Sequence, residues 1–373
     1  MTFTLTVDKQ RWQSHIDSVA REIDQAGAVL IPVVKGNGYG FGRQPIAEQT
    51  SRIHAEVMCV GTVWEVESVV TEFSRLIHVL EPINFSDSAQ IAKWFEVLEK
   101  FSFKIIATVG STNIEQLADL GVRHIMLDCL TSLNRFGLTF DEIKNVVHKI
   151  PPSIKLYGFS LHLPIADSRK QIRTTKSELI EHAKESSIKV QEVINAISSL
   201  QSIHTSEKLV ISVSHLSPIE LKSITATFEN IDLQIRMGTE LWLGAPEALQ
   251  VTGTVLAIHD VSSNEGAGYT QTPGKGKLII VSGGTSHGVA LAAPKTTTTF
   301  RKKLIAIAEG YAQAFGRVRS PFTLRGKNLM FAEPPHMHVS MLWTDELNVN
   351  VGDKLSCTVR NTTANFDVVE FVQ

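Results

Sequence analysis

Lys35 has the residue type and the setting for covalent chemistry. It follows Val33 and Val34 and precedes a glycine-rich turn, Gly-Asn-Gly-Tyr-Gly-Phe-Gly, that ends at Gly42. A lysine at the end of an apolar run can be partly desolvated, which lowers the pKa of its amine and makes it nucleophilic. Such an amine could form a Schiff base with a carbonyl compound. The alternative, a strand-end lysine in a flexible loop, is equally consistent with these residues.

Short β-rich runs alternate with amphipathic segments over the first three-fifths of the chain, and these elements must position Lys35. Residues 29–34 are apolar and β-branched, as in a strand buried on both faces. Similar runs follow at residues 57–61, 76–80, 104–109, 124–127, 156–161, 209–213 and 233–235, and helices are predicted at 8–25, 114–120, 140–149 and 175–198. These alternations predict an α/β fold, a (β/α)8 TIM-like barrel over residues 8–242, with Lys35 at the catalytic face.

The pattern changes after Gly244. Turns rich in Gly, Pro and Asn separate strand-like runs at residues 251–259, 277–282, 337–342 and 354–360, and residues 300–315 are predicted to be helical. We therefore expect a mainly β C-terminal domain over residues 243–373. Residues 2–7 are also strand-like, and we expect them to join this domain.

Composition argues against several classes of protein. Among 373 residues, 36 Lys and Arg nearly balance 38 Asp and Glu, so no basic field for nucleic acid is expected. The N-terminus lacks a signal-peptide pattern, and the apolar runs are too short to cross a bilayer. Cys59, Cys129 and Cys357 form no metal-type pair or disulfide framework. We expect a cytoplasmic protein with no nucleic-acid or membrane partner.

The segment around Lys35 resembles the pyridoxal 5'-phosphate (PLP) lysine motif of the alanine racemases. In that family Ala-Asn-Ala-Tyr-Gly-His-Gly follows the lysine, whereas Gly36, Gly38 and Phe41 replace the two alanines and the histidine here. The resemblance implies a two-domain, fold-type III enzyme with a PLP-binding barrel. It also implies that Lys35 and Tyr39 contact the cofactor.

Two further barrel segments follow in the family's order. Leu-Asn-Arg-Phe-Gly-Leu resembles Met-x-Arg-Leu-Gly-Phe, which implies that Arg135 lies near the PLP 3-oxygen and the substrate. Asp128 stands where many members carry a carbamylated lysine, and its charge could orient Arg135 through an ion pair. Ser-Leu-His-Leu-Pro-Ile-Ala-Asp resembles Thr-His-Phe-Ala-x-Ala-Asp, which implies that His162 stacks on the pyridine ring. Taken alone, a helix-capping arginine and a structural histidine remain alternatives.

The phosphate and the pyridine nitrogen have implied partners in the last part of the barrel. Ser214 lies where the family has Asn-Ser-Ala and is the implied phosphate ligand, with His215 as the alternative. Gln-Ile-Arg-Met-Gly-Thr resembles Met-Val-Arg-Pro-Gly-Ile, so Arg236 is implied to bond the pyridine nitrogen. The backbone of Gly238 and Thr239 would then bind the phosphate. Because an arginine keeps its proton, that nitrogen stays unprotonated, which favours clean proton exchange.

The resemblance is weaker in the C-terminal domain. Tyr269, after Glu-Gly-Ala-Gly, lies where the family's Val-Ser-Tyr-Gly carries the second catalytic base, with a half-buried strand tyrosine as the alternative. Met341 matches the methionine of Val-x-Met-Asp, beside the substrate, but Leu342 replaces the aspartate. Phe366 replaces the tyrosine that reaches the phosphate.

The resemblance thus implies a homodimeric, PLP-dependent amino-acid racemase that uses Lys35 and Tyr269 as two bases. Alternatives are a lyase or decarboxylase of the same fold, or a non-catalytic PLP-binding protein. Cys357 falls in no decarboxylase motif. His336 and His338, two apart on a predicted strand, could share a metal as in D-specific lyases, although an exposed or hydrogen-bonded pair is favoured and no metal is expected.

Overall fold

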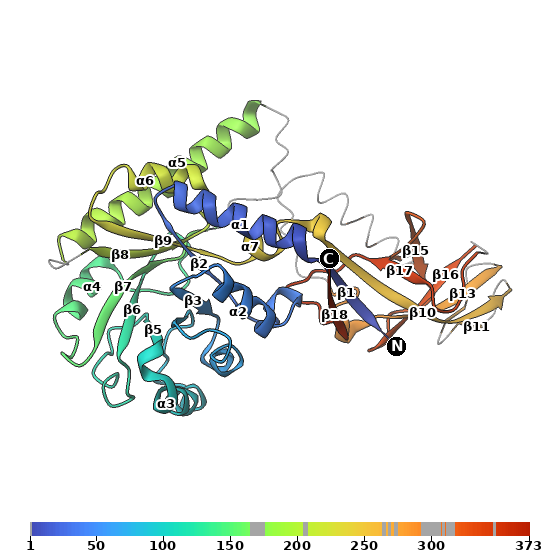
Figure 1. Ribbon diagram of the computed structural model, residues 1–373, viewed down its shortest axis with the longest axis horizontal. Coiled ribbons are helices and arrows are strands. Elements are labelled where there is room, and N and C mark those ends of the chain that lie inside the picture. Colours follow the sequence, from blue (N-terminus) through green and yellow to red (C-terminus); the bar gives the residue numbers. More distant parts are fainter. Residues whose placement is uncertain are drawn as a thin grey trace. The chain divides into compact units, whose positions relative to one another are not determined.

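The computed structural model describes residues 2–164, 176–203, 208–262, 266–267, 270–271, 275–291, 307, 310, 318–345 and 348–373. The chain forms two compact units. The barrel unit comprises Ser14–Gly38 and Arg43–Gly244, and the β unit comprises Met1–Gln13, Tyr39–Gly42 and Ala245–Gln373. Figure 1 labels their helices and strands.

Eight parallel strands form the centre of the barrel unit. They are β2 (Val29–Pro32), β3 (Val57–Val60), β4 (Leu76–Val79), β5 (Ile105–Val109), β6 (His124–Cys129), β7 (Lys155–Leu161), β8 (Leu209–Ser214) and β9 (Ile231–Met237), in the order β2-β9-β8-β7-β6-β5-β4-β3. Val33 bridges Cys59 in parallel beyond the end of β2, and Val34 N–H donates to Cys59 O at 2.7 Å. This bridge nearly closes the sheet, so the predicted TIM-like barrel is confirmed.

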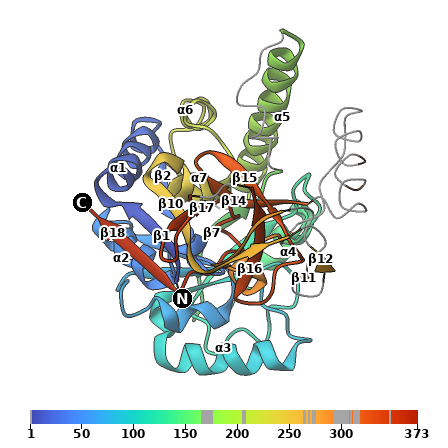
Figure 2. The same cartoon turned by 90° about the vertical axis from the view of Figure 1, so that its right-hand side faces the viewer.

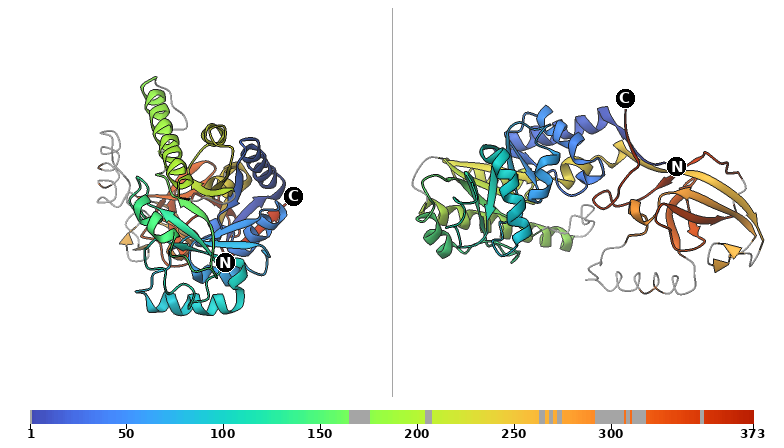
Figure 3. Two further views of the ribbon diagram at one scale, coloured as in Figure 1. Left: turned by 90° about the vertical axis from the view of Figure 1, so that its left-hand side faces the viewer. Right: turned by 90° about the horizontal axis from the view of Figure 1, so that it is seen from below.

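Helices surround these strands (Figures 1 and 3). Among the described residues, the helices are α1 (Lys9–Gln25), α2 (Arg43–Arg52), α3 (Ser88–Phe101), α4 (Phe140–Val147), α5 (Lys176–Gln201), α6 (Pro218–Thr225) and α7 (Thr239–Leu243). Short 3-10 turns are η1 (Gly38–Gly40), η2 (Val63–Ser68) and η3 (Ser102–Lys104). Thr139 with Glu142 and Ser217 with Glu220 form capping boxes that start α4 and α6. None of the described helices is both long and apolar enough to cross a membrane.

One predicted helix of the barrel unit is wrong. Residues 114–120 form consecutive turns instead of a helix, with Leu117 N–H bonded to Ile114 O and Leu120 N–H bonded to Gln116 O. Seven residues are too few to repay the cost of helix nucleation unless tertiary packing supports them. Gly121, with φ of 88°, then turns the chain into β6.

The β unit contains a second, antiparallel barrel (Figure 2). Its strands are β10 (Leu249–Val261), β13 (Gly276–Ser282), β14 (Arg319–Leu324), β15 (Lys327–Phe331), β16 (Val339–Thr344) and β17 (Lys354–Cys357), in the order β13-β16-β15-β14-β17-β10. The sheet closes because β13 pairs with β10 as well as with β16. Additional 3-10 turns are η5 (Pro246–Ala248) and η6 (Thr285–His287). The mainly β second domain is therefore confirmed.

The N-terminal strand belongs to this β unit. β1 (Phe3–Asp8) pairs antiparallel with β10 and parallel with β18 (Val368–Val372). β11 (Gly266–Ala267) and β12 (Thr270–Gln271) form a separate two-stranded sheet. Nearly all of residues 300–315, where a helix is predicted, lie outside the described residues.

Trp242 of α7 fastens the end of strand β2. Its indole Nε1–H donates to Val33 O at 2.8 Å, and the side chain is fully buried. We expect Trp242→Phe to destabilise the protein by about 2 kcal/mol, because it leaves the buried Val33 carbonyl without this hydrogen bond and creates a small void. Urea unfolding followed by far-UV circular dichroism measures this change. Trp64→Phe is the matched control, since Trp64 is 48% exposed, and it should change the stability by less than about 0.5 kcal/mol. Equal effects of the two substitutions would contradict the role of this hydrogen bond.

Candidate functional site

Four sequence-predicted residues lie at the C-terminal ends of barrel strands. Lys35 follows β2, His162 follows β7, Ser214 is the last residue of β8, and Arg236 is the next-to-last residue of β9. Ser214 and Arg236 are register partners across the β8–β9 pair. Since all these strands are parallel, their C-terminal ends meet at one face of the barrel, where such folds build their sites.

Arg236 is the most constrained side chain of this face. Its Nη1 donates to Ser212 O at 2.7 Å and to Ser212 Oγ at 2.9 Å, while its Nη2 donates to Leu161 O at 3.0 Å. The residue is 6% exposed, and burial lowers the pKa of its guanidinium. These bonds use at most three of its five N–H groups. At least two therefore have no acceptor in the described part of the chain and can donate to a ligand.

His162 is held as a neutral ring. Its Nδ1 lies 3.1 Å from Ser214 Oγ, and Thr131 Oγ1 donates to its carbonyl at 2.6 Å. Burial lowers the pKa of His162 to about 3, and the nearby charges of Arg236 and Arg135 act in the same direction. A neutral imidazole can stack on a flat ring without adding charge. The hydroxyl of Ser214, the implied phosphate ligand, contacts His162 in this structure.

His215 follows β8 with a left-handed backbone, at φ of 60°, and its ring meets that of His162 edge to face at 5.2 Å. The pKa of His215 is lowered to about 4, mainly by burial and next by the positive charge of Lys189. Lys189 Nζ donates to His215 O at 3.3 Å from helix α5. Sequence reasoning missed Lys189, although it lies at helical spacing on the apolar face that carries Val193 and Ala196.

Lys35 lies among cations. Burial lowers the pKa of its amine, and the charges of Arg135 and Arg236 lower it further. The negative charge of Glu65 acts in the opposite direction. A lowered pKa increases the fraction of unprotonated amine, which is the form that attacks a carbonyl.

The ion pair considered between Asp128 and Arg135 is not formed in the described structure. Asp128 is 7% exposed, and burial raises the pKa of its carboxyl against the charges of Arg236 and Arg135. The guanidinium of Arg135 lies instead over the Phe136 ring, 5.2 Å from its centroid. The reason is that the loop after β6 keeps Arg135 on its exposed side, whereas Asp128 points from a buried strand position.

Gly238 and Thr239 follow strand β9 directly. Gly238 precedes the first residue of α7, and its carbonyl accepts from Trp242 N–H at 2.9 Å. Thr239 is exposed at the start of this short helix. The two residues implied in phosphate binding therefore lie just beyond Arg236 on the same strand end.

The remaining sequence-predicted residues belong to the β unit. Tyr39 is buried with φ of 56°, and Met341 of β16 packs against Val261 and Leu278. Leu342, which replaces the family's aspartate, is fully buried. Tyr269 lies outside the described residues.

Phe366 takes part in an aromatic contact instead of a polar one. Its ring stacks on Phe3 with centroids 5.5 Å apart and an interplanar angle of 16°. The loss of the family's tyrosine hydroxyl is thus accompanied by packing of this ring against the N-terminal strand.

The strand predicted at residues 337–342 begins at Val339, so His336 and His338 precede it. The alternative that they share a metal assumed that they lie two apart on one strand, and it loses this premise. His336 Nε2 bonds Glu333 Oε1 at 2.8 Å, whereas the His338 ring faces the His287 ring at 5.9 Å. The two histidines therefore have different partners. Within the described ranges, no group of three or more His, Cys, Asp or Glu side chains is arranged to hold a metal ion.

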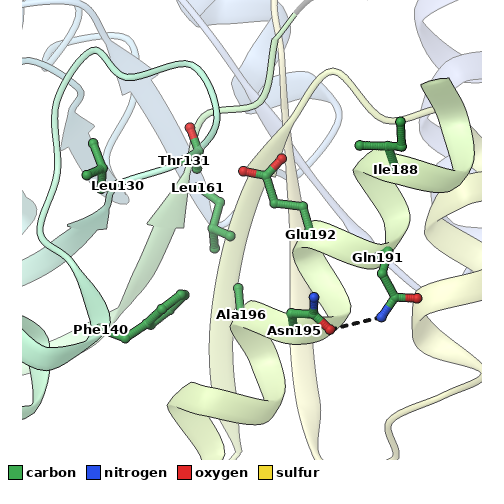
Figure 4. Close-up of a pocket in the computed structure, with 9 residues that line it drawn as sticks. All are labelled: Leu130, Thr131, Phe140, Leu161, Ile188, Gln191, Glu192, Asn195 and Ala196. Carbon is green, nitrogen blue, oxygen red and sulfur yellow. Dashed lines mark hydrogen bonds between the residues drawn. The ribbon is translucent and has the colours of Figure 1, made fainter.

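A pocket of about 470 Å³ lies beside the strand ends of the barrel unit (Figure 4). It is lined by Leu130, Thr131, Phe140, Leu161, Ile188, Gln191, Glu192, Asn195 and Ala196. The Glu192 carboxylate already accepts from Ser132 N–H at 2.7 Å and from Ser132 Oγ at 2.8 Å. Gln191 Nε2 donates to Asn195 Oδ1 at 2.9 Å. None of the sequence-predicted site residues lines this pocket.

Comparison with known proteins gives a consistent result. A family model described as the alanine racemase N-terminal domain matches residues 7–207. No curated protein sequence matches the chain significantly.

Solved structures resemble the chain over most of its length. An alanine racemase from Bacillus anthracis with bound L-Ala-P is 15% identical, with a TM-score of 0.70, and the match covers 100% of this chain and 95% of that one. An alanine racemase from Bartonella henselae with covalently bound pyridoxal phosphate is 15% identical, with a TM-score of 0.66 and coverages of 96% and 90%. A histidine racemase from Leuconostoc mesenteroides is also 15% identical, with a TM-score of 0.61 and coverages of 95% and 87%. At these identities the likeness concerns the fold.

The charge of Lys189 should be measurable through His215. In the cofactor-free protein, we expect Lys189→Met to raise the pKa of His215 from about 4, because it removes the second cause of the lowering. His162 should keep its pKa of about 3, since Lys189 is not among its causes. An NMR titration of ¹⁵N-labelled histidines measures both values. Lys184→Met, an exposed lysine of the same helix, should move neither; an unchanged His215 in Lys189→Met would refute the coupling.

The same histidines make stability depend on pH. Both are neutral in the folded chain above about pH 4, but they take up protons near their ordinary pKa of about 6.5 once unfolded. The unfolded state therefore binds more protons between about pH 4 and 6.5, so stability should fall as the pH falls through this window. Urea midpoints at pH 7 and pH 5 test this. His162→Gln should weaken the dependence, whereas an undiminished dependence would contradict it.

Proposed function

Because this chain belongs to the alanine racemase family, we propose that it is a PLP-dependent racemase that interconverts L- and D-amino acids. One observation carries the proposal. Lys35, His162, Ser214 and Arg236 meet at the C-terminal ends of four parallel strands, and Arg236 is fixed there with N–H groups to spare. We further propose that it acts in the cytoplasm as a homodimer in which each subunit contributes to its partner's site.

The residues present fit PLP. Lys35, Arg135, Arg236 and Lys189 concentrate positive charge that suits a phosphate and a carboxylate. Lys35 would hold the cofactor through Nζ, and the spare N–H groups of Arg236 would bond the pyridine nitrogen. His162 presents a neutral ring for stacking.

The phosphate would be held near the start of α7. We assign Ser214 and the backbone N–H groups of Gly238 and Thr239 to the phosphate, and His215 is the alternative to Ser214. We also assign Tyr39 to the cofactor-binding residues. Glycine at position 238 allows a close approach of the backbone to an oxyanion.

In the proposed mechanism, two side chains exchange one proton of the substrate. When bound, PLP supplies an electron sink that acidifies the substrate's Cα–H. Lys35 Nζ takes or returns the proton on one face of Cα, and its lowered pKa favours the free amine that this needs. The Tyr269 hydroxyl serves the opposite face. Arg236 keeps its own proton, so it gives none to the pyridine nitrogen and protonation at Cα is favoured.

We propose that the substrate is an amino acid that need not be alanine, with Arg135 and Met341 beside it. Leu342 removes a family carboxylate, and Phe366 removes a phenol. The fold neighbours include a histidine racemase as well as alanine racemases. A lyase or decarboxylase of the same fold, or a non-catalytic PLP-binding protein, is the alternative.

Lys35 should carry the cofactor. Borohydride reduction of the PLP-loaded protein should attach the pyridoxyl group to Lys35, as located by peptide mass spectrometry. Lys35→Ala should abolish both the labelling and the activity, because it removes the amine that we assign to the Schiff base. Lys144→Ala, an exposed lysine of α4, is the matched control and should keep both. Labelling of a different lysine would overturn the assignment.

Exchange of the substrate's Cα proton tests the reaction itself. The protein and PLP are incubated in heavy water with a panel of L- and D-amino acids, and NMR with chiral chromatography follows exchange and inversion. We expect exchange with inversion for at least one amino acid. Exchange without inversion, or no exchange despite bound PLP, would contradict a racemase and favour one of the alternatives.

The second base can be tested in the same assay. We expect Tyr269→Phe to slow inversion by about 10²- to 10⁴-fold. The enantiomer whose Cα–H faces Lys35 should still exchange with retention. Tyr157→Phe removes a hydroxyl at the start of β7, far along the strand from the site, and should preserve inversion. Wild-type inversion in Tyr269→Phe would refute the second base.

A further inference from the structure

The residue that follows Lys35, Gly36, is held at both its N–H and its carbonyl, which belong to two successive peptides. Gly36 N–H donates to Glu65 Oε1 at 2.9 Å, and the Arg43 guanidinium donates to Gly36 O through Nη1. The second carboxylate oxygen of Glu65 accepts from Gly61 N–H at 2.7 Å. Gly61 directly follows strand β3. One carboxylate thus joins the turn after β2 to the turn after β3.

The two side chains that hold Gly36 are themselves connected. Arg43 Nε donates to Ser68 Oγ at 2.6 Å, and Ser68 Oγ donates to Glu65 O at 2.6 Å. Glu65 and Ser68 both belong to η2, and Arg43 is the first residue of α2. The network therefore closes on itself, and its geometry is set by two elements outside the strands.

Among the described residues, the Glu65 carboxylate bonds only backbone groups. No cation of the described chain forms an ion pair with it, and both carboxylate oxygens accept backbone N–H groups at the strand ends. A Cβ built on Gly61 would lie 3.1 Å from Glu65 Oε2 and 3.2 Å from Lys35 Cβ. We call the Glu65 and Arg43 side chains that hold Gly36 the clamp. It lies against the base of the Lys35 side chain.

The turn after Lys35 needs such a clamp. Gly36 has φ of 62°, and Gly38 and Gly40 also have positive φ. Glycines in such turns have several accessible conformations, so hydrogen bonds must select one. Two charge-assisted bonds, one to the peptide before the Gly36 Cα and one to the peptide after it, restrict this freedom strongly.

We propose that Glu65, together with Arg43, is a positioning residue for Lys35. The carboxylate fixes the Lys35–Gly36 backbone to the end of β3, so that only the lysine side chain moves when the amine changes between holding the cofactor and transferring a proton. The inference rests on the proposed function for its catalytic consequence. The structural part, a fixed Gly36 peptide, can be measured without cofactor.

The first test is amide hydrogen exchange in the full-length, cofactor-free protein. We expect Glu65→Gln to speed exchange of the Gly36 and Gly61 amides by at least about tenfold relative to amides of β6, because a glutamine amide offers one acceptor oxygen instead of two. Glu67→Gln is the matched control, since Glu67 lies on the same turn but pairs with Lys93 at 2.7 Å and Lys100 at 3.0 Å. It should leave both glycine amides within about twofold. Unchanged exchange in Glu65→Gln overturns the proposal.

A second readout separates positioning from general stability. The negative charge of Glu65 raises the pKa of Lys35, so Glu65→Gln should lower it, as measured by NMR of the ¹³C-methylated lysine. Glu67→Gln should not. Arg43→Gln keeps the carboxylate and releases the Gly36 carbonyl, so it should speed exchange of Gly36 more than that of Gly61. If Glu65→Gln does not fold, Arg43→Gln alone tests the proposal. Equal exchange of the Gly36 amide in Arg43→Gln and in the wild type then overturns it.

Kinetics then connect the clamp to catalysis. In the PLP-loaded enzyme, we expect Glu65→Gln to lower kcat by about tenfold or more and to change KM little, while borohydride still labels Lys35. If the wild type does not racemise any amino acid but the amide and pKa changes occur, the proposed function fails and the clamp stands. If the wild type racemises and Glu65→Gln matches it in kcat, the positioning role is refuted.

Discussion

The buried guanidinium of Arg236 is the interaction on which the site depends. It bonds the backbone at Ser212 and Leu161 and thereby ties strands β7, β8 and β9 together where they end. Its charge lowers the pKa of both Lys35 and His162. It also opposes the rise that burial causes in the pKa of Asp128. A cation that cannot release its proton is thus kept in a partly desolvated place, where it acts strongly on its neighbours. An anionic, aromatic ligand is the natural complement of this arrangement.

The strand ends and the turn after Lys35 differ in how strongly their backbone is constrained. Ladder hydrogen bonds fix the parallel strands, whereas the glycine-rich turn after Lys35 has little conformational preference of its own. The Glu65 carboxylate and the Arg43 guanidinium compensate for that freedom by bonding the N–H and the carbonyl of Gly36. In the proposed positioning role, these bonds leave the lysine side chain as the part that moves.

The departures from the family's motifs have structural counterparts. Phe366 stacks on Phe3, and Leu342 is buried on β16, so both replacements are integrated into apolar packing. Burial raises the pKa of the Asp128 carboxyl, and the charge of Arg236 opposes this more strongly than that of Arg135. Arg135 is exposed over Phe136 and is available to a ligand. The strand ends of the barrel thus keep Lys35, His162 and Arg236 together, whereas Leu342 and Phe366 depart from the alanine racemase motifs.

By itself, the sequence determined the strands of the barrel, because an apolar, β-branched run between amphipathic segments has few other solutions. It also predicted that Lys35, His162 and Arg236 lie at strand ends, because each follows or ends such a run. The helix predicted at residues 114–120 was wrong, since a short segment depends on packing that local pattern does not contain. Only the tertiary structure brought Glu65 to Gly36 and Lys189 to His215, across 29 and 26 residues of chain. Such contacts are decided by how the strand ends converge, and no local pattern of residue types encodes them.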